Sequence, residues 1–299
     1  MIRGMLLGPL AAALIGAAPA LAQQDLSQVE IKTEKLADGV YALLGAGGNI
    51  GLAVGKDATF LVDDQFAPLT PKIQAAIAVL TKRPVDFVVN THWHFDHVGG
   101  NENFGEAGAL IVAHDNVRTR LTTTQEIKAL GRTVPASPKA ALPVVTFSES
   151  TTFHINGDTL HVFHVAHAHT DGDAIVHFKN ANVIHMGDTF FNGIYPFIDV
   201  ESGGNVRGMI AAADRVLALA DDKTKIIPGH GPIGDRASLA AYRRMLADIA
   251  AKVDAAIMAG RDLDAILAAK PTAAYDAEWG GGFVSGERLV EFVYNSLKR

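Results

Sequence analysis

The chain has 299 residues, 48% of them hydrophobic and 19% charged, and its net charge is −6. This composition suits a globular protein with a sizeable core and excludes a disordered or fibrous chain. No long basic run is present, which argues against nucleic acid as a partner because phosphate binding needs clustered Lys and Arg. The chain has no cysteine, so any metal must be held by histidines and carboxylates.

The first 22 residues have the pattern of a secretory signal peptide. One arginine precedes an apolar stretch at residues 5–18, and Ala20, Leu21 and Ala22 form a small-x-small cleavage pattern. A membrane anchor is the alternative, but glycines and prolines interrupt the stretch, which is shorter than the roughly 20 residues that a span needs. We expect cleavage after Ala22, a periplasmic or secreted protein without membrane attachment, and a single domain over residues 23–299.

Taken in chain order, the predicted elements form two similar halves. Short β-rich runs alternate with turns over residues 29–64 and predict an antiparallel meander, and Thr70 and Pro71 predict the cap and first residue of a helix. The predicted strands and helices that follow lie at residues 85–90, 109–114, 115–123, 151–155, 159–165, 174–178, 182–186, 206–217, 224–231, 235–258 and 285–298. Residues 124–143 are expected to form a surface flap or an irregular helix. The order of strands followed by a helix occurs twice along the chain. This repeat predicts two packed sheets with helices on the outside.

The segment "THWHFDHVGG" follows the apolar run "VDFVVN" and carries the strongest chemical signal. Residues two apart after a strand can point the same way, so His92 and His94 can share one metal while Asp96 and His97 turn toward a second. Zinc binds imidazole nitrogen and carboxylate oxygen readily. An exposed polar loop is the alternative, but the segment lies between an apolar strand and two glycines, where charge is costly unless it is bound.

This segment resembles the signature of the metallo-β-lactamase superfamily, and four further motifs follow the order of that family. They are Asp63 in "FLVDD", with Asp64 as the substitute, His169 in "AHTDGD", Asp188 in "VIHMGD" and His230 in "IIPGHG". The resemblance implies an α/β fold, a four-layer αββα sandwich of two mixed sheets, and two zinc ions per chain. It implies a first metal on His92, His94 and His169, a second on Asp96, His97 and His230, and Asp188 as the bridge. Asp63 is expected to hydrogen-bond the backbone of the metal loop.

The remaining histidines are expected to have structural roles. His114 follows a strand and is expected to cap the next helix, and those inside strands are expected to face solvent or pack in a polar shell: His154, His161, His164, His177 and His185. His167 lies two residues before His169, so it is a candidate for packing behind the metal ligands or in the pocket wall.

The loop after Asp188 is expected to form a wall of the substrate pocket. Gly204 and Asn205 lie at a helix start, where backbone N–H groups favour an anion such as a substrate carboxylate. Asn205 as a simple helix cap is the equal alternative. Aromatic candidates for the pocket rim are Trp93, Phe190, Phe191, Tyr195 and Phe197.

The expected activity is hydrolysis of an amide, lactone or thioester by a metal-bound hydroxide, with Asp96 and Asp188 in catalytic roles and a small molecule as substrate. A dedicated β-lactamase is the first alternative. The family's true β-lactamases lack the bridging Asp, and many carry a lysine in the loop after that position, whereas residues 189–208 contain none. Two hypotheses from different classes are an iron-binding redox relative and a non-catalytic metal-binding protein, and His94 favours zinc over iron. The oligomeric state is left open.

Overall fold

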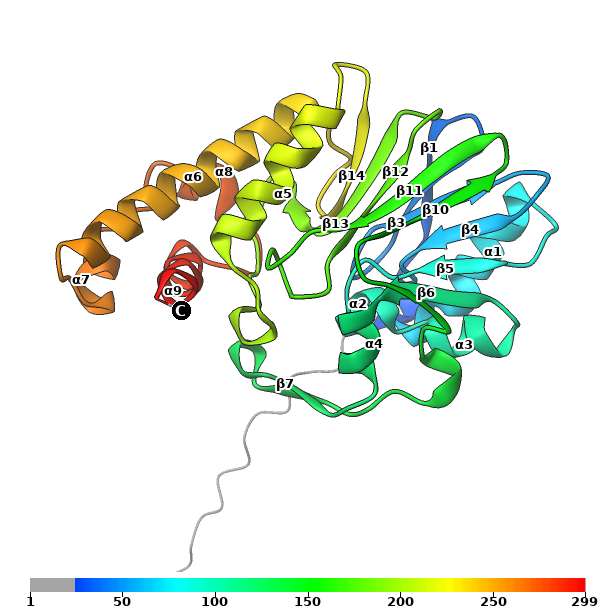
Figure 1. Ribbon diagram of the computed structural model, residues 1–299, viewed down its shortest axis with the longest axis horizontal. Helices are drawn as coiled ribbons and strands as arrows, with labels where there is room; N and C mark the ends of the chain where they lie inside the picture. Colours follow the sequence, from blue (N-terminus) through cyan, green and yellow to red (C-terminus); the bar gives the residue numbers. More distant parts are fainter. Residues whose placement is uncertain (1–24, 299) are drawn as a thin grey trace, which may run out of the picture.

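Two β-sheets pack face to face and helices cover both outer sides, in a computed structural model that describes residues 25–298 (Figure 1). The predicted four-layer αββα sandwich is confirmed. The predicted signal peptide lies outside the described residues. Within residues 25–298, no helix combines the length and apolar character that crossing a membrane requires.

The first sheet has seven strands in the order β1-β2-β3-β4-β5-β6-β9. The first four form the predicted antiparallel meander, and β4, β5, β6 and β9 run parallel. The strands are β1 (Lys32–Ala37), β2 (Val40–Leu44), β3 (Ile50–Val54), β4 (Thr59–Val62), β5 (Phe87–Val89), β6 (Leu110–His114) and β9 (Val145–Phe147). Because β4 and β5 are parallel, their carboxyl ends meet at one edge, where the chain enters the histidine-rich segment.

The second sheet has five strands in the order β10-β11-β12-β13-β14, and only β13 and β14 are parallel within it. The strands are β10 (Ser150–Ile155), β11 (Asp158–His164), β12 (Ala174–Phe178), β13 (Val183–Phe191) and β14 (Lys225–His230). All nine residues of β13 are buried, since α5 and α6 cover one face of this sheet and the other sheet covers the opposite face.

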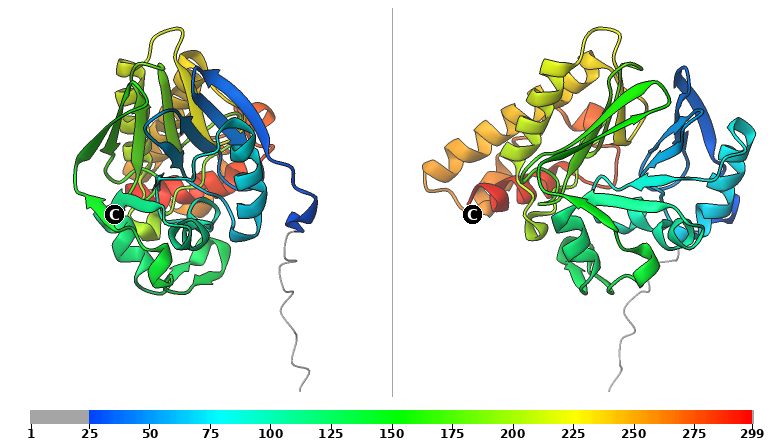
Figure 2. Two further views of the ribbon diagram at one scale, coloured as in Figure 1. Left: turned by 90° about the vertical axis from the view of Figure 1, so that its right-hand side faces the viewer. Right: turned by 45° about the vertical axis from the view of Figure 1, so that its right-hand side comes forward.

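Helices lie on the two outer faces, as Figure 2 shows from two further directions. Ile73 and Ile77 of α1 and Phe104 of α3 pack on the first sheet, and Met209, Leu246 and Val293 belong to the core outside the second. A third apolar cluster, with Phe60, Val89 and Val176, fills the space between the sheets. The helices are α1 (Thr70–Leu80), α2 (Phe95–Val98), α3 (Asn101–Glu106), α4 (Asp115–Leu121), α5 (Val206–Leu219), α6 (Arg236–Met258), α7 (Leu263–Ala268), α8 (Asp276–Trp279) and α9 (Gly286–Leu297).

Two local predictions need correction. Residues 124–143 contain a small antiparallel hairpin, β7 (Gln125–Ile127) and β8 (Arg132–Val134), whose three-residue strands are too short to show a period in the sequence. Thr70 is the first residue of α1 and not its cap, because a 3-10 turn at Ala67–Leu69 leads directly into the helix.

The predicted cap at His114 is confirmed, since its ring accepts a hydrogen bond from the N–H of Asn116.

Asn49, just before β3, joins the two sheets at the edge where the histidine-rich segment lies. Its N–H donates to Gly229 O at 2.7 Å, and its side chain donates to Pro228 O at 3.0 Å and to Gly231 O at 2.9 Å. His185 of β13 lies 2.9 Å from Asn49 O through Nε2. These bonds fix the end of β14, and therefore His230, against the first sheet.

Candidate metal centre

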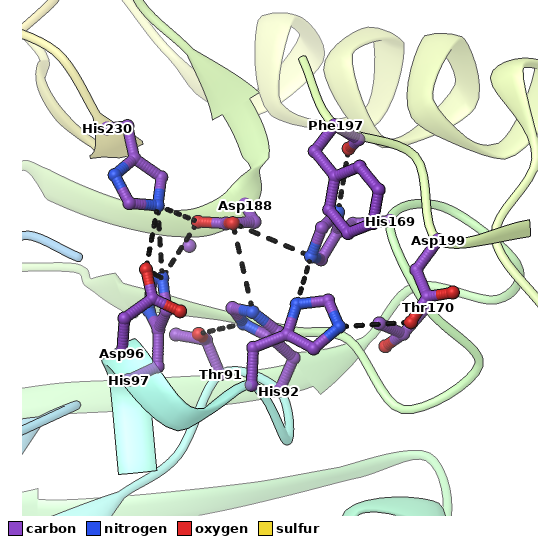
Figure 3. Close-up of polar contacts among 12 residues, drawn as sticks. Thr91, His92, Asp96, His97, His169, Thr170, Asp188, Phe197, Asp199 and His230 are labelled. Carbon is purple, nitrogen blue, oxygen red and sulfur yellow. Dashed lines mark hydrogen bonds and ion pairs between the residues drawn. The ribbon is translucent and has the colours of Figure 1, made fainter. Parts of the chain in front are cut away.

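Seven side chains from the two sheets converge on one site, which Figure 3 shows with Asp188 at its centre. The turn after β5 and the start of α2 supply His92, His94, Asp96 and His97, while His169 lies in the connection between β11 and β12. Asp188 lies within β13, and His230 ends β14. All seven candidates from the sequence are therefore brought together.

The first group, His92, His94, His169 and Asp188, is fully buried and offers ligand atoms within 4.8 Å of one another. Nε2 of His169 lies 2.8 Å from Nδ1 of His94 and 3.5 Å from Oδ2 of Asp188, and Nε2 of His92 lies 3.8 Å from the same oxygen. Three imidazole nitrogens and one carboxylate oxygen thus surround a single point.

Asp63 and Thr91 fix the proton on His92. Asp63 accepts hydrogen bonds from the N–H of Thr91 and from its hydroxyl, both at 2.7 Å. Since the hydroxyl proton goes to Asp63, Thr91 Oγ1 can only accept from Nδ1 of His92, which lies 3.0 Å away. Nε2 of His92 therefore presents a lone pair to the site, and the predicted bond from the loop backbone to Asp63 is present. Asp64, the substitute candidate, points elsewhere and accepts from the N–H of Gly100 at 2.8 Å.

Two further acceptors fix the ring protons of the other histidines: Asp199 acts on His94, and the Phe197 carbonyl acts on His169. Asp199 Oδ2 lies 3.0 Å from Nε2 of His94, and Nδ1 of His169 lies 2.8 Å from Phe197 O. Burial alone would raise the pKa of Asp199, but hydrogen bonds from His94 and Ser202 lower it to about 2. An ionised carboxylate only accepts, so the His94 proton lies on Nε2 and its Nδ1 lone pair faces the site.

The second group is Asp96, His97 and His230. Nε2 of His230 lies 3.3 Å from Asp96 Oδ2 and 3.4 Å from Asp188 Oδ1, and Nε2 of His97 lies 3.0 Å from Asp188 Oδ1. Asp63 Oδ2, 2.8 Å from Nδ1 of His97, accepts the proton on that side of the ring. Asp188 therefore directs one oxygen to each group.

This donor set fits bound cations. Within residues 25–298, Nε2 of His92 is buried without a hydrogen-bond partner, although it faces Oδ2 of Asp188. The lone pairs of His94 and His169 face each other across 2.8 Å when both rings are neutral. Buried unpaired acceptors are costly, and a positive ion between them removes that cost.

Two glycines make room for these side chains. A Cβ on Gly48 would lie 2.1 Å from Cε1 of His97, and one on Gly229 would lie 1.9 Å from Oδ1 of Asp188. A side chain at either glycine would therefore displace the neighbouring candidate ligand, His97 or Asp188.

Comparison with known proteins agrees with this geometry. The family model described as the metallo-beta-lactamase superfamily matches residues 44–230, a range that includes all seven side chains. The chain belongs to this superfamily. It is 28% identical over 144 residues to hydroxyacylglutathione hydrolase of Nitrosococcus oceani, with 48% of this chain and 47% of that protein covered. It is 26% identical over 162 residues to acyl-coenzyme A thioesterase MBLAC2 of Bos taurus, with 50% and 56% covered.

The chain spans only about half the length of these curated relatives. Among solved structures, a metallo-β-lactamase from Pontibacter korlensis superposes with a TM-score of 0.60 at 21% identity, covering 73% of this chain and all of that one. At this identity, the likeness establishes a shared fold.

The aromatic pocket rim predicted for this superfamily member is wrong at Trp93 and Tyr195. Trp93 is 1% exposed and Tyr195 is fully buried, so neither reaches a surface that a substrate could touch. Tyr195 points its hydroxyl at Asp276 Oδ1, 2.9 Å away, and Trp93 packs into the outer core of the second sheet. Phe190, Phe191 and Phe197 are buried as well. Phe190 and Phe191 end β13, and all three rings belong to the core outside the second sheet.

Gly204 and Asn205 also differ from the predicted anion site. The N–H of Gly204 donates to Asp199 O and that of Asn205 donates to Ala168 O, both at 2.8 Å, so neither is free for a substrate. The Asn205 side chain accepts from the N–H of Arg207 at 2.8 Å, and the helix-cap alternative is therefore confirmed. His167 is exposed with a positive φ of 51°, and its Nδ1 lies 3.1 Å from Gly203 O. This backbone turn directs it outward, away from a place behind the metal ligands.

Sequence reasoning missed Thr91, Asp173 and Asp199, which orient the ligands. Asp173 accepts from the N–H of Thr170 at 2.8 Å and from its hydroxyl at 2.5 Å, which fixes the turn that carries His169. The Thr-x-x-Asp spacing of Thr170 and Asp173 was a readable turn signal. Nothing in the sequence pairs Asp199 with His94, because the two residues are 105 positions apart.

Replacing Asp199 with Ala is expected to weaken the first metal site by about 10- to 100-fold, because the ring of His94 loses the acceptor that fixes its proton. Asp199→Asn keeps an oxygen acceptor and should lose less. Zinc affinity measured by competition with a chromogenic chelator checks both variants. Equal affinity of Asp199→Ala and the unmodified protein would remove this role.

Proposed function

We propose that the chain is a hydrolase that holds two zinc ions and cleaves a thioester, lactone or amide. The observation that carries this proposal is Asp188, whose Oδ2 faces His92 and His169 while Oδ1 faces His97 and His230. A carboxylate so placed could serve two cation sites, one held with His92, His94 and His169 and the other with Asp96, His97 and His230.

Bound zinc would supply a Lewis acid for the carbonyl oxygen and a water of lowered pKa at neutral pH. The chain itself supplies Asp96 at the open side of the site. Burial would raise the pKa of Asp96, but His97 and His230 lower it to about 2, so the group is ionised at neutral pH. Its side chain is 18% exposed, which lets it accept a hydrogen bond from an attacking water and orient that water toward the substrate.

A thioester is the substrate class that we place first. The two curated relatives described above are named as a hydroxyacylglutathione hydrolase and an acyl-coenzyme A thioesterase. A dedicated β-lactamase fits less well. In the loop after Asp188, Arg207 is the only Lys or Arg, and its Nη2 lies 3.4 Å from the carboxylate of Asp254, outside the site.

The zinc-reconstituted protein is expected to hydrolyse a small acyl thioester faster than an acyl lactone or a nitrocefin-type β-lactam. Treatment with a chelator should abolish hydrolysis, and added zinc should restore it. Steady-state hydrolysis rates and the metal content are measured on the same samples. A rate that survives complete removal of metal would contradict the proposal, and iron in place of zinc would favour a redox relative. No turnover of any substrate would favour a metal-dependent binding protein.

A further inference from the structure

Arg132, at the start of β8, lies over the metal loop. Its guanidinium carbon is 3.6 Å from the ring centre of Phe95, the first residue of α2 and the neighbour of Asp96. Phe95 is half-buried and Arg132 is exposed. A guanidinium stacked on a ring keeps its N–H edge free for hydrogen bonds in the plane.

This arginine is unpaired, unlike two others of the described chain. Arg120 forms a two-pronged ion pair with Asp171 at 2.7 and 2.8 Å, and Arg288 donates to Ala129 O at 2.7 Å. The guanidinium of Arg132 makes no hydrogen bond or ion pair with any residue in the range 25–298. It is therefore a cation stacked on the residue next to Asp96, and the donors of its guanidinium are all available.

The hairpin that carries Arg132 is held in place. Arg288 of α9 bonds Ala129 in the turn between β7 and β8, and Leu130 and Val134 pack against the outer core of the second sheet. Phe95 is supported in turn by Phe66, 6.0 Å away between ring centres. Arg132 thus projects from an anchored element, which reduces the conformational entropy lost on binding a ligand.

Phe283 offers an exposed apolar surface beside Phe197, a residue that packs on two histidines of the first group. Its side chain is 62% exposed, and its ring centre lies 6.5 Å from that of Phe197. Phe197 in turn lies 5.8 Å from His94 and 5.7 Å from His169. Large exposed apolar side chains beside a site commonly contact ligands.

We propose that Arg132 binds an anionic group of the substrate, a carboxylate or its equivalent, while Phe283 contacts the apolar part. The substrate class is then an amphipathic acid whose scissile acyl bond lies between its anionic and apolar ends. Guanidinium and carboxylate form paired hydrogen bonds of matching geometry, which favours this assignment over a neutral polar group. This inference rests on the proposed hydrolase function. It adds that the preferred substrate carries an anionic group and an apolar group.

The test compares two thioesters that differ only in a terminal group, a carboxylate in one and a primary amide in the other. In the zinc-loaded protein, Arg132→Gln should raise the ratio of KM for the acid to KM for the amide by about tenfold, the size of one charge-assisted hydrogen-bond pair. Arg132→Glu should reverse the preference. Arg261→Gln is the matched control, since Arg261 is exposed in the connection between α6 and α7. An unchanged ratio in Arg132→Gln, or an equal change in Arg261→Gln, would overturn the inference.

Binding gives a second readout that does not depend on turnover. Calorimetry with 2-mercapto-3-phenylpropanoate and its amide should show about tenfold weaker binding of the acid to Arg132→Gln, with the amide much less affected. Phe283→Ala should weaken both ligands. If the unmodified protein hydrolyses neither thioester, the proposed function fails while this binding comparison still tests Arg132. Equal affinity of acid and amide for the unmodified protein would overturn the role of Arg132 itself.

Discussion

Asp188→Asn is expected to lower kcat/KM by about 10³-fold and to reduce bound zinc. Lewis-acid stabilisation by metal is worth several kcal/mol, and each 1.36 kcal/mol is about a factor of ten in rate. Burial alone would raise the pKa of Asp188, but His230, His97 and His92 hold it well below its usual range, so the charge of this carboxylate is part of the site. Asparagine keeps the shape and removes that charge from both metal groups.

Steady-state kinetics and zinc content after dialysis measure this effect. Asp254→Asn is the matched control, because Asp254 lies on the exposed face of α6, where it pairs with Arg207. The control should retain full zinc and rate. Two tightly bound zinc ions and an unchanged rate in Asp188→Asn would show that Asp188 does not bridge the metals.

Zinc binding to the metal-free protein is expected to release protons mainly from the second group. Burial alone would lower the pKa of His230, but Asp188 and Asp96 raise it to about 9. The pKa of His97 is raised well above its usual value by Asp188, Asp96 and Asp63, against the effect of burial. Burial lowers the pKa of His169 to about 4, and it lowers that of His92 well below the usual value. At pH 7 the imidazoles of His92 and His169 are therefore neutral, whereas His97 and His230 carry protons that a metal must displace.

The sign of the pH effect follows from these directions. Affinity of the second group should rise with pH from 7 toward 9, by up to about tenfold per pH unit for each proton displaced, while the first group should change little. Titration calorimetry in buffers of different ionisation enthalpy counts the released protons. Two binding events with equal proton release, or with none, would contradict this assignment of charges.

The candidate ligands were predictable because each lies in a short motif that resembles one of the superfamily, in or soon after a strand. A histidine beside Thr170 and an aspartate after Gly187 can be read from neighbouring residues, and so can the strands that position them. The loop aromatics were not predictable in this way. Tyr195 could equally have faced a substrate or the core, and the bond to Asp276 in α8 that decides the matter joins residues 81 positions apart.

The same physical reason explains the residues that were missed. Asp199 orients His94, and Arg132 stacks on Phe95, through contacts between segments whose relative placement arises only when the two sheets pack. The hairpin carrying Arg132 has strands of three residues, too short for a hydrophobic period. By contrast, α9 was predicted nearly to its bounds, since Leu289, Val290 and Val293 repeat at helical spacing.

The central claim is that this chain holds two metal ions on either side of Asp188. Anomalous scattering at the zinc edge from crystals of the zinc-loaded protein tests it most directly. Two peaks are predicted, one among His92, His94 and His169 and one among Asp96, His97 and His230, both next to Asp188. A single peak, or peaks away from these side chains, would contradict the account.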